Sequence, residues 1–208
     1  MIIAIDGFAA SGKGTLATIL AERLGYARLD TGLIYRATGL GVLEAGGDPE
    51  NPDDALAAAK ALTPALLDDG RLREPAVTAA AYKVAAQTPV RDVLRQFQKD
   101  FAANPPGGAP GAVLDGRDIG TVICPDADVK LFVSADVEIR AKRRFEELQS
   151  QGKTDTYPAV LQAMRDRDAS DAENTVPADD AVHLDTTALT IDQVVEKALS
   201  IIDARRTS

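Results

Sequence analysis

The chain has 208 residues, of which 45% are hydrophobic, and its formal net charge is -9. This composition excludes wholesale disorder, and the acidic balance argues against binding to duplex DNA or anionic membranes, because both need a basic footprint. The single cysteine, Cys124, excludes an internal disulfide and a thiolate metal cluster.

The start of the chain predicts a phosphate-binding loop. The apolar run Met1–Asp6 is typical of a buried strand, and a glycine-bounded loop and a helical pattern follow it. The spacing Gly-x-x-x-x-Gly-Lys fits the P-loop, in which backbone N–H groups and a helix N-terminus cradle phosphates beside a lysine. We therefore expect a nucleoside triphosphate to contact Gly7, Phe8, Ala9, Ala10, Ser11, Gly12, Lys13, Gly14 and Thr15.

The residue after the lysine departs from the P-loop pattern. The pattern places Ser or Thr there as a Mg²⁺ ligand, whereas this chain has Gly14 and offers its first hydroxyl at Thr15. We expect Mg²⁺ to rest on phosphates, waters and a carboxylate from elsewhere, with Thr15 as a candidate ligand. Lys-Gly-Thr resembles the loop of nucleoside monophosphate kinases rather than that of GTPases.

A second motif, Asp-Thr-Gly-Leu-Ile-Tyr-Arg, leaves the predicted strand Ala27–Asp30. Gly25 ends the helix before this strand. Asp30 and Thr31 can cap a following helix that carries Arg36 in its first turns. An ordinary strand-turn-helix with a surface arginine would explain the same residues.

Residues 41–110 differ in composition from the rest of the chain. Alanine-rich helical stretches are broken by Asp-Pro, Asn-Pro and Asp-Gly pairs and by a run rich in Pro and Gly. This pattern predicts an inserted helical lobe.

The predicted strand Ala112–Asp115 leads into a third motif, Asp-Gly-Arg-Asp-Ile-Gly-Thr. Asp115 is suitably placed to hold the waters around Mg²⁺, and the glycines let a ligand approach the backbone. A tight turn stabilised by an Arg–Asp pair is the alternative. Because both motifs accompany a P-loop, we favour the functional interpretation.

An arginine cluster follows the predicted strand Val129–Val133. Arg140, Arg143 and Arg144 have helical spacing and share one face. A solvated basic face paired with nearby glutamates is the alternative. We favour a role at the transferring phosphoryl group, because an acidic protein that binds phosphates must gather its arginines locally.

The last part of the chain combines a polar segment with a strand and a helix. Residues 150–180 are polar and broken by glycine and proline, and we expect them to form a lid. The strand Ala181–Asp185 follows, and Thr190 and Gln193 form a capping box for a final helix.

Alternation of five strands with helices predicts an α/β fold of the P-loop NTPase, nucleoside monophosphate kinase type. We expect a five-stranded parallel sheet with helices on both faces and with ligands beyond the carboxyl ends of the strands. We interpret residues 1–208 as one kinase domain. Its predicted parts are a core of 1–40, 111–149 and 181–208, an inserted lobe at 41–110 that binds the nucleoside monophosphate, and the lid at 150–180.

Together the three motifs resemble those of bacterial cytidylate kinases, a family that phosphorylates CMP and dCMP with ATP. The resemblance spans most of the chain and includes Pro-Val-Arg at residues 89–91 and Arg-Asp-x-x-Asp at residues 167–171. It implies that the acceptor phosphate is held by Arg36 and Arg117, the cytosine by Thr31, Arg91 and Asp118, and the ribose by Arg167 and Asp171. The implied catalytic residues are Lys13, Arg117, Arg140, Arg144 and Arg167.

The resemblance also implies the reaction and its participants. ATP would donate its γ-phosphoryl group in line to CMP or dCMP, with Mg²⁺ as cofactor and without a covalent enzyme intermediate. We expect a cytoplasmic monomer with no nucleic acid polymer or membrane as partner, because the sequence lacks a signal-like start and a membrane-length apolar run.

Some features depart from the family pattern and leave alternatives. The lobe is short, Tyr82 stands where a small hydroxyl residue is usual, and the lid has Ser170 and Asn174 where arginines are common. One alternative is a kinase for another small acceptor, such as a different monophosphate or shikimate. Another is a GTPase-like switch or an inactive nucleotide-binding module, which Gly14 and the lack of an Asn-Lys-x-Asp segment disfavour.

Overall fold

The computed structural model describes residues 1–206, which fall into two compact units. The first unit comprises Met1–Arg28 and the chain from Ala109 onward, and the second comprises Leu29–Gly108. The division after Arg28 lies earlier than the predicted start of the lobe at residue 41. The reason is that the helix beginning at Thr31 packs against the other helices of the second unit.

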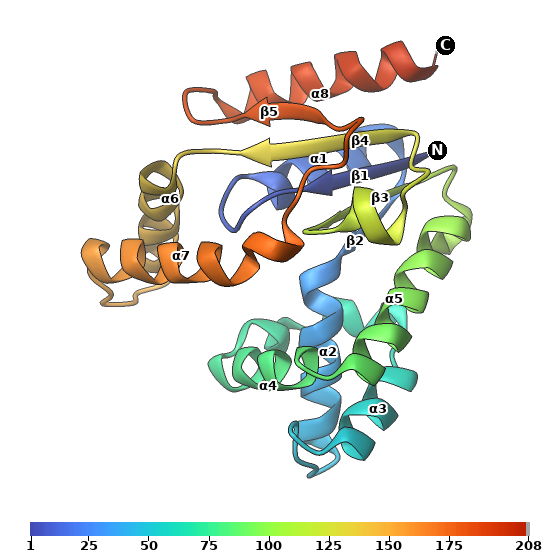
Figure 1. Cartoon of the computed structure of the whole chain (residues 1–208), viewed down its shortest axis with the longest axis vertical. Helices are drawn as coiled ribbons and strands as arrows, with labels where there is room; N and C mark the ends of the chain where they lie inside the picture. The colour runs from blue at the N-terminus through green and yellow to red at the C-terminus, as the bar shows by residue number, and fades with distance from the viewer. Residues whose placement is uncertain (207–208) are drawn as a thin grey trace. The chain divides into compact units, whose positions relative to one another are not determined.

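Five strands form one sheet in the order β2-β3-β1-β4-β5 (Figure 1). They are β1 (Ile2–Asp6), β2 (Ala27–Asp30), β3 (Ala112–Gly116), β4 (Val129–Ser134) and β5 (Val182–Asp185). Strand β1 pairs in parallel with β3 and β4, and β4 pairs in parallel with β5. The predicted α/β fold with a five-stranded parallel sheet is confirmed, and β1 is its central strand.

The core of the first unit fixes the end of β1. Ile3 and Ile5 of β1 are fully buried against helices α1 (Lys13–Leu24) and α8 (Ile191–Arg206). Gly25 ends α1 in a left-handed conformation (φ 66°), as its sequence predicts. Because α1 packs along the sheet, its N-terminus is held next to the carboxyl end of β1.

Two further helices of the first unit form a pair. Helices α6 (Val137–Ser150) and α7 (Tyr157–Asp171) pack through a second apolar cluster. The buried members of this cluster are Ala141, Leu148, Val160 and Met164.

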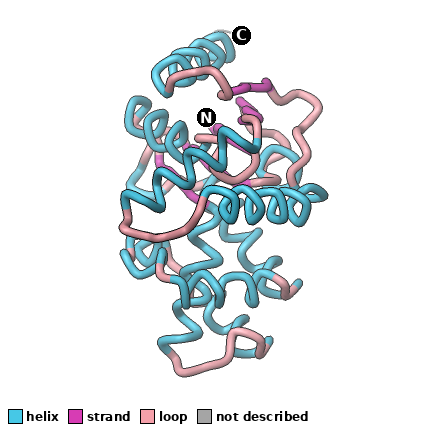
Figure 2. The backbone as a smooth tube through the Cα atoms, turned by 90° about the vertical axis from the view of Figure 1, so that its left-hand side faces the viewer, coloured by secondary structure: helices cyan, strands magenta, loops and turns pink. Residues whose placement is uncertain are grey.

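Beyond the end of β2, the second unit contains only helices and loops within residues 31–108 (Figure 2). Its α-helices are α2 (Thr31–Glu44), α3 (Pro52–Lys60), α4 (Pro75–Ala85) and α5 (Thr88–Ala103). The Asp30 carboxylate accepts a bond of 2.9 Å from the backbone N–H of Gly32, so the predicted cap of α2 is present.

The capping box of α8 supports a stability prediction. The Thr190 hydroxyl accepts from the Gln193 backbone N–H at 3.3 Å, and the Gln193 side chain accepts from the Thr190 N–H at 3.0 Å. Thr190→Ala should lower the free energy of unfolding by about 1 kcal/mol in urea denaturation, because a helix N–H loses its partner. Ser200→Ala, at an exposed position of the same helix, is the control. Equal stability of the two variants would contradict the prediction.

Candidate active site

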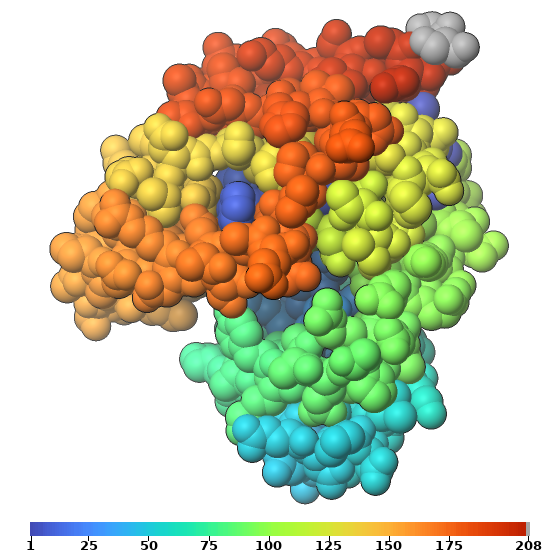
Figure 3. All heavy atoms as spheres, viewed as in Figure 1, coloured from blue at the N-terminus to red at the C-terminus, as the bar shows by residue number. Residues whose placement is uncertain are grey.

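The loop between β1 and α1 has the backbone of a phosphate cradle. Gly7 has φ 147°, and a Cβ atom there would overlap the carbonyl oxygen of Val133. Gly12 (φ 93°) precedes α1 in the left-handed region, so the helix begins at Lys13. Both positions therefore require glycine. Figure 3 shows part of the N-terminal segment (blue) in a hollow edged by the yellow and orange segments of α6 and α7.

Positive charge gathers at this loop. The Lys13 ammonium group folds back over the loop and donates to the carbonyl oxygen of Phe8 at 3.4 Å. The first N–H groups of α1 point toward the same end of the helix and have no carbonyl partner within it. The loop can therefore bind an anion through both a full and a partial positive charge.

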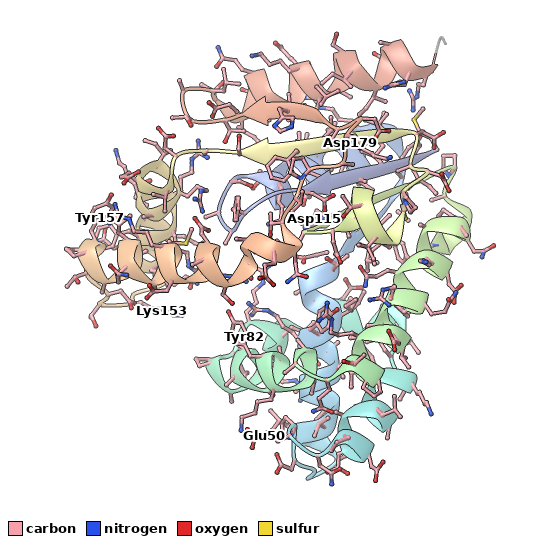
Figure 4. The ribbon with its side chains drawn as sticks, in the orientation of Figure 1. Glu50, Tyr82, Asp115, Lys153, Tyr157 and Asp179 are labelled. Atoms are coloured by element: carbon pink, nitrogen blue, oxygen red, sulfur yellow. The ribbon has the colours of Figure 1, made fainter. Side chains whose placement is uncertain are left out.

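Asp115, in strand β3, is a carboxylate that lies next to this loop, and Figure 4 labels it. Its carboxylate is 4% exposed, and its Oδ2 atom would be 3.5 Å from a Cβ atom built on Gly14. Arg28 of β2 donates to the other oxygen, Oδ1, at 3.3 Å. The missing side chain at Gly14 thus leaves space next to a buried carboxylate, and this arrangement fits Mg²⁺.

Protein groups alone do not complete a metal shell there. Within residues 1–206, no three His, Cys, Asp or Glu side chains come together as a set that could hold a metal ion. A cation at Asp115 would therefore take its remaining ligands from phosphate and water oxygens, as Mg²⁺ does at phosphate-transfer sites.

Asp6, the last residue of β1, organises the third motif. Its two carboxylate oxygens accept bonds of 2.8 Å from the backbone N–H groups of Ile119 and Gly120. These residues open the short π-helix η4 (Ile119–Ile123). Burial raises the pKa of Asp6, and the two N–H bonds oppose this shift only in part.

Arg117 connects the third motif to the loop and to α7. It donates from Nη1 to the Gly7 carbonyl oxygen at 3.0 Å and from Nε to Asp171 at 3.0 Å. Arg167 lies 3.6 Å from the same carboxylate. The structure thus brings together the loop with Arg117, Arg167 and Asp171, all predicted as site residues.

The arginine cluster of α6 divides among three environments. Arg140 is buried and pairs with Asp168, whereas the half-buried Arg144 pairs with Glu147 at 2.7 Å. Arg143 donates to Thr186 in the loop after β5. Spacing on one helix face therefore did not predict the partners of these arginines.

The remaining predicted substrate residues of the second unit lie on α2 and α5. Thr31 is 7% exposed in the first turn of α2. Arg36 donates at 3.0 Å to the Leu72 carbonyl oxygen and at 3.0 Å to the Thr78 hydroxyl. Arg91 is exposed on α5. Asp118 belongs to the first unit, directly before η4.

A cavity beside the phosphate loop combines residues predicted for the site with Thr186 and Leu189, which the sequence did not indicate. It has a volume of about 240 Å³, and its lining includes Ser11, Gly12, Thr15, Arg143, Thr186 and Leu189. The helical spacing of the arginines on α6 indicated that Arg143 belongs to the site. No local pattern indicated Thr186, because its contacts to Arg143 and to the Ser11 carbonyl oxygen span distant parts of the chain.

Comparison with known sequences identifies the family. The sequence model of the cytidylate kinase family matches residues 3–204. The chain belongs to this family. Curated cytidylate kinases of Rhodospirillum rubrum and Paramagnetospirillum magneticum are each 54% identical to it, over 97% and 99% of both chains respectively. A third, from Granulibacter bethesdensis, is 51% identical over 97% of this chain and 96% of its own.

Family membership makes the chain a kinase that phosphorylates CMP with ATP, as the three motifs indicate. The alternative acceptors, including shikimate, are not favoured. Among solved structures, shikimate kinase from Bacteroides thetaiotaomicron aligns with a TM-score of 0.55 at 10% identity, over 98% of both chains. A Thermus thermophilus protein aligns with a TM-score of 0.54 at 20% identity, over 98% of this chain and 96% of its own. These similarities support the P-loop kinase fold alone.

No helix within residues 1–206 combines the length and apolarity that crossing a membrane requires.

The raised pKa of Asp6 predicts a pH dependence of stability. The pKa of Asp6 is about 3.8 in the unfolded chain and higher in the folded protein. Protonated Asp6 therefore contributes fully to the free energy of unfolding below pH 3.8, and this contribution is lost as the pH rises through the pKa of the folded state. Asp6→Asn removes this titration and one acceptor. Its deficit in unfolding free energy relative to the wild type should therefore narrow between about pH 4 and pH 7 in urea denaturation. Asp126→Asn, at an exposed position, controls for loss of surface charge. A deficit that stays constant or widens would contradict the assignment.

Proposed function

We propose that the chain transfers the γ-phosphoryl group of ATP directly to a phosphate oxygen of CMP, with dCMP as a second acceptor. The observation that carries this proposal is the loop of Gly7 to Lys13, with Lys13 folded over it and Arg117 bonded to its first carbonyl oxygen. The acceptor is already an anion, so no protein base and no covalent intermediate are needed. Catalysis then consists of positioning and charge neutralisation.

The phosphates of ATP are proposed to bind at the loop. Backbone N–H groups of residues 7–15 and the Lys13 ammonium group would hold the β- and γ-phosphates. Asp115 would hold Mg²⁺ through water, with Thr15 as a second candidate ligand, and the ion would supply charge stabilisation to the phosphates. Arg144 and Arg167 are the further cations proposed to face the transferring group.

Arg117 is suited to contact a phosphate. Its hydrogen bonds within residues 1–206 use Nε and Nη1, so the two N–H groups of Nη2 are available to an oxygen. The side chain is 21% exposed and can therefore meet a ligand. A guanidinium also matches phosphate oxygens in a two-point geometry.

The cavity between the loop and α8 is proposed to receive the base of ATP. Its volume of about 240 Å³ is below the range of about 300–1,000 Å³ for whole small-molecule ligands, which suits a base rather than a complete nucleotide. Leu189 and Ile191 provide apolar contact, and Arg143 provides a planar cation.

The CMP contacts follow the resemblance of the motifs. We assign the acceptor phosphate to Arg36 and Arg117, and the ribose to Arg167 and Asp171. Cytosine recognition is assigned to Thr31, Arg91 and Asp118. We further propose a cytoplasmic monomer, because both substrates are small cytoplasmic nucleotides and neither requires a second subunit for the assigned contacts.

Lys13 provides a direct test of the loop. Lys13→Met should reduce kcat by about 100-fold or more, because a preorganised positive charge at the transferring group is lost. ADP release measured in the presence of CMP gives the rate, and thermal unfolding verifies the fold. Lys99→Met, at an exposed position of α5, should retain the wild-type rate. Full activity of Lys13→Met would refute the proposed role of the loop.

Asp118 provides a test of base recognition. A carboxylate can accept from the exocyclic amine of cytosine, whereas uracil presents an acceptor at that position. Asp118→Asn should lower the ratio of kcat/KM for CMP to that for UMP by about tenfold or more. ADP release against CMP, dCMP and UMP measures this ratio. An unchanged ratio would remove Asp118 from the proposed site.

A further inference from the structure

Arg140 joins three parts of the first unit. From α6 it donates through Nη1 to the Ala9 carbonyl oxygen at 3.3 Å. Through Nη1 and Nη2 it donates to the two carboxylate oxygens of Asp168 on α7, at 2.9 and 2.5 Å. Its Nε donates to the carbonyl oxygen of Ala135 at 2.8 Å. The phosphate loop, the start of α6 and α7 therefore meet at one guanidinium.

These bonds leave Arg140 little capacity for a ligand. They engage four N–H groups of the roughly five that an arginine possesses, and the side chain is only 5% exposed. Arg117 differs, because its Nη2 is free of bonds within residues 1–206 and more of its surface is accessible. The two arginines thus have different capacities for binding a phosphate.

Arg140 instead contacts the part of the loop that is hardest to hold. Its guanidinium lies over the Phe8 ring, 5.5 Å from the centroid. Ala10 has φ 58°, a left-handed conformation that is unfavourable for a residue with a Cβ atom. Ala9 and Ala10 also pack against the apolar cluster of α6 and α7. The loop conformation at residues 8–10 therefore depends on this helix pair.

Asp168 makes the arrangement possible. A buried guanidinium without a counter-charge is strongly unfavourable, and a carboxylate that accepts from both Nη atoms supplies charge and orientation together. A second bridge has the same form: Arg117 joins the Gly7 carbonyl oxygen to Asp171, three residues further along α7. Two carboxylates of one helix thus support two carbonyl groups of the phosphate loop.

We propose that Asp168 is a positioning residue for phosphoryl transfer. It orients Arg140, and Arg140 holds Phe8, Ala9 and Ala10 in the conformation that receives the phosphates of ATP. This inference rests on the proposed binding of ATP at the loop. It assigns Arg140 the support of the loop rather than direct contact with the transferring group.

Asp168→Asn is the primary test. Asparagine replaces one accepting oxygen by an N–H donor that faces the guanidinium, and it removes the counter-charge. KM for ATP should rise by about tenfold with KM for CMP unchanged, and backbone amides of residues 8–10 should exchange faster in the nucleotide-free protein. Asp168→Glu keeps both oxygens and the charge, so it should restore at least part of the ATP affinity.

A matched control lies two residues earlier on the same helix. Asp166 is exposed and accepts from Gln162 at 2.8 Å. Asp166→Asn removes the same charge and should leave both KM values and the amide exchange at wild-type levels.

Two further variants keep the inference falsifiable. In an Arg140→Met background, Asp168→Asn should change KM for ATP no further, because residues that act as a unit are not additive. If Asp168→Asn does not fold, Arg140→Lys replaces it. Lysine keeps the charge but has a single nitrogen, so KM for ATP should again rise and amides 8–10 should again exchange faster.

The outcomes separate this inference from the proposed function. Unchanged KM for ATP in folded Asp168→Asn, or additive effects in the double variant, would overturn the positioning role. An inactive Lys13→Met together with a normal Asp168→Asn would leave ATP binding at the loop in place and remove only the role of Asp168. An active Lys13→Met would count against the loop itself.

Discussion

The close approach of the phosphate loop to strand β4 is the constraint on which the rest of the site depends. Gly7 leaves β1 so near the Val133 carbonyl oxygen that a side chain could not be accommodated. Because β1 is the central strand and is paired on both sides, the start of the loop cannot shift without disturbing the sheet. Within the first unit, Lys13 at the start of α1 and Asp115 at the end of β3 lie beside the loop that begins at this point.

Charge balance is the second organising feature. The chain carries a formal net charge of -9, yet it must hold anions, and it does so by concentrating arginines near the loop. Each of these arginines already has a protein partner, such as Asp171 for Arg117 and Asp168 for Arg140. Carboxylates therefore keep the cationic groups oriented, and charge-assisted bonds give that orientation its rigidity.

Residues 150–180, which the sequence predicts as a lid, lack arginine at two positions where the family commonly has it. Ser170 lies at the end of helix α7, and Asn174 lies in the short 3₁₀ turn (Ala172–Asn174) that follows it. Because both side chains are uncharged, this end of the segment gains no positive charge from them. Near the phosphate loop, positive charge comes from the buried Arg140 of α6 and from the partly exposed Arg117 of the turn after β3. In the second unit, Tyr82 is 59% exposed on α4.

Local patterns in the sequence determined much of the architecture. The apolar runs identified all five strands, and the boundaries of Ala27–Asp30 agree fully. Gly25 and the capping box at Thr190 identified helix ends, because their signals act over only a few residues. The P-loop spacing likewise located the triphosphate-binding loop, since its chemistry lies in contiguous residues.

Only the tertiary structure decided how the charged groups are partnered. Asp6 accepts bonds from Ile119 and Gly120, and Arg140 donates to Asp168; in each case the partners are distant in sequence and share no local pattern. No local sequence pattern predicted the contact between Arg28 and Asp115, which the structure shows. Helical spacing could place an arginine on a face, but whether that face meets solvent, a carboxylate or a loop carbonyl depends on which elements pack against it.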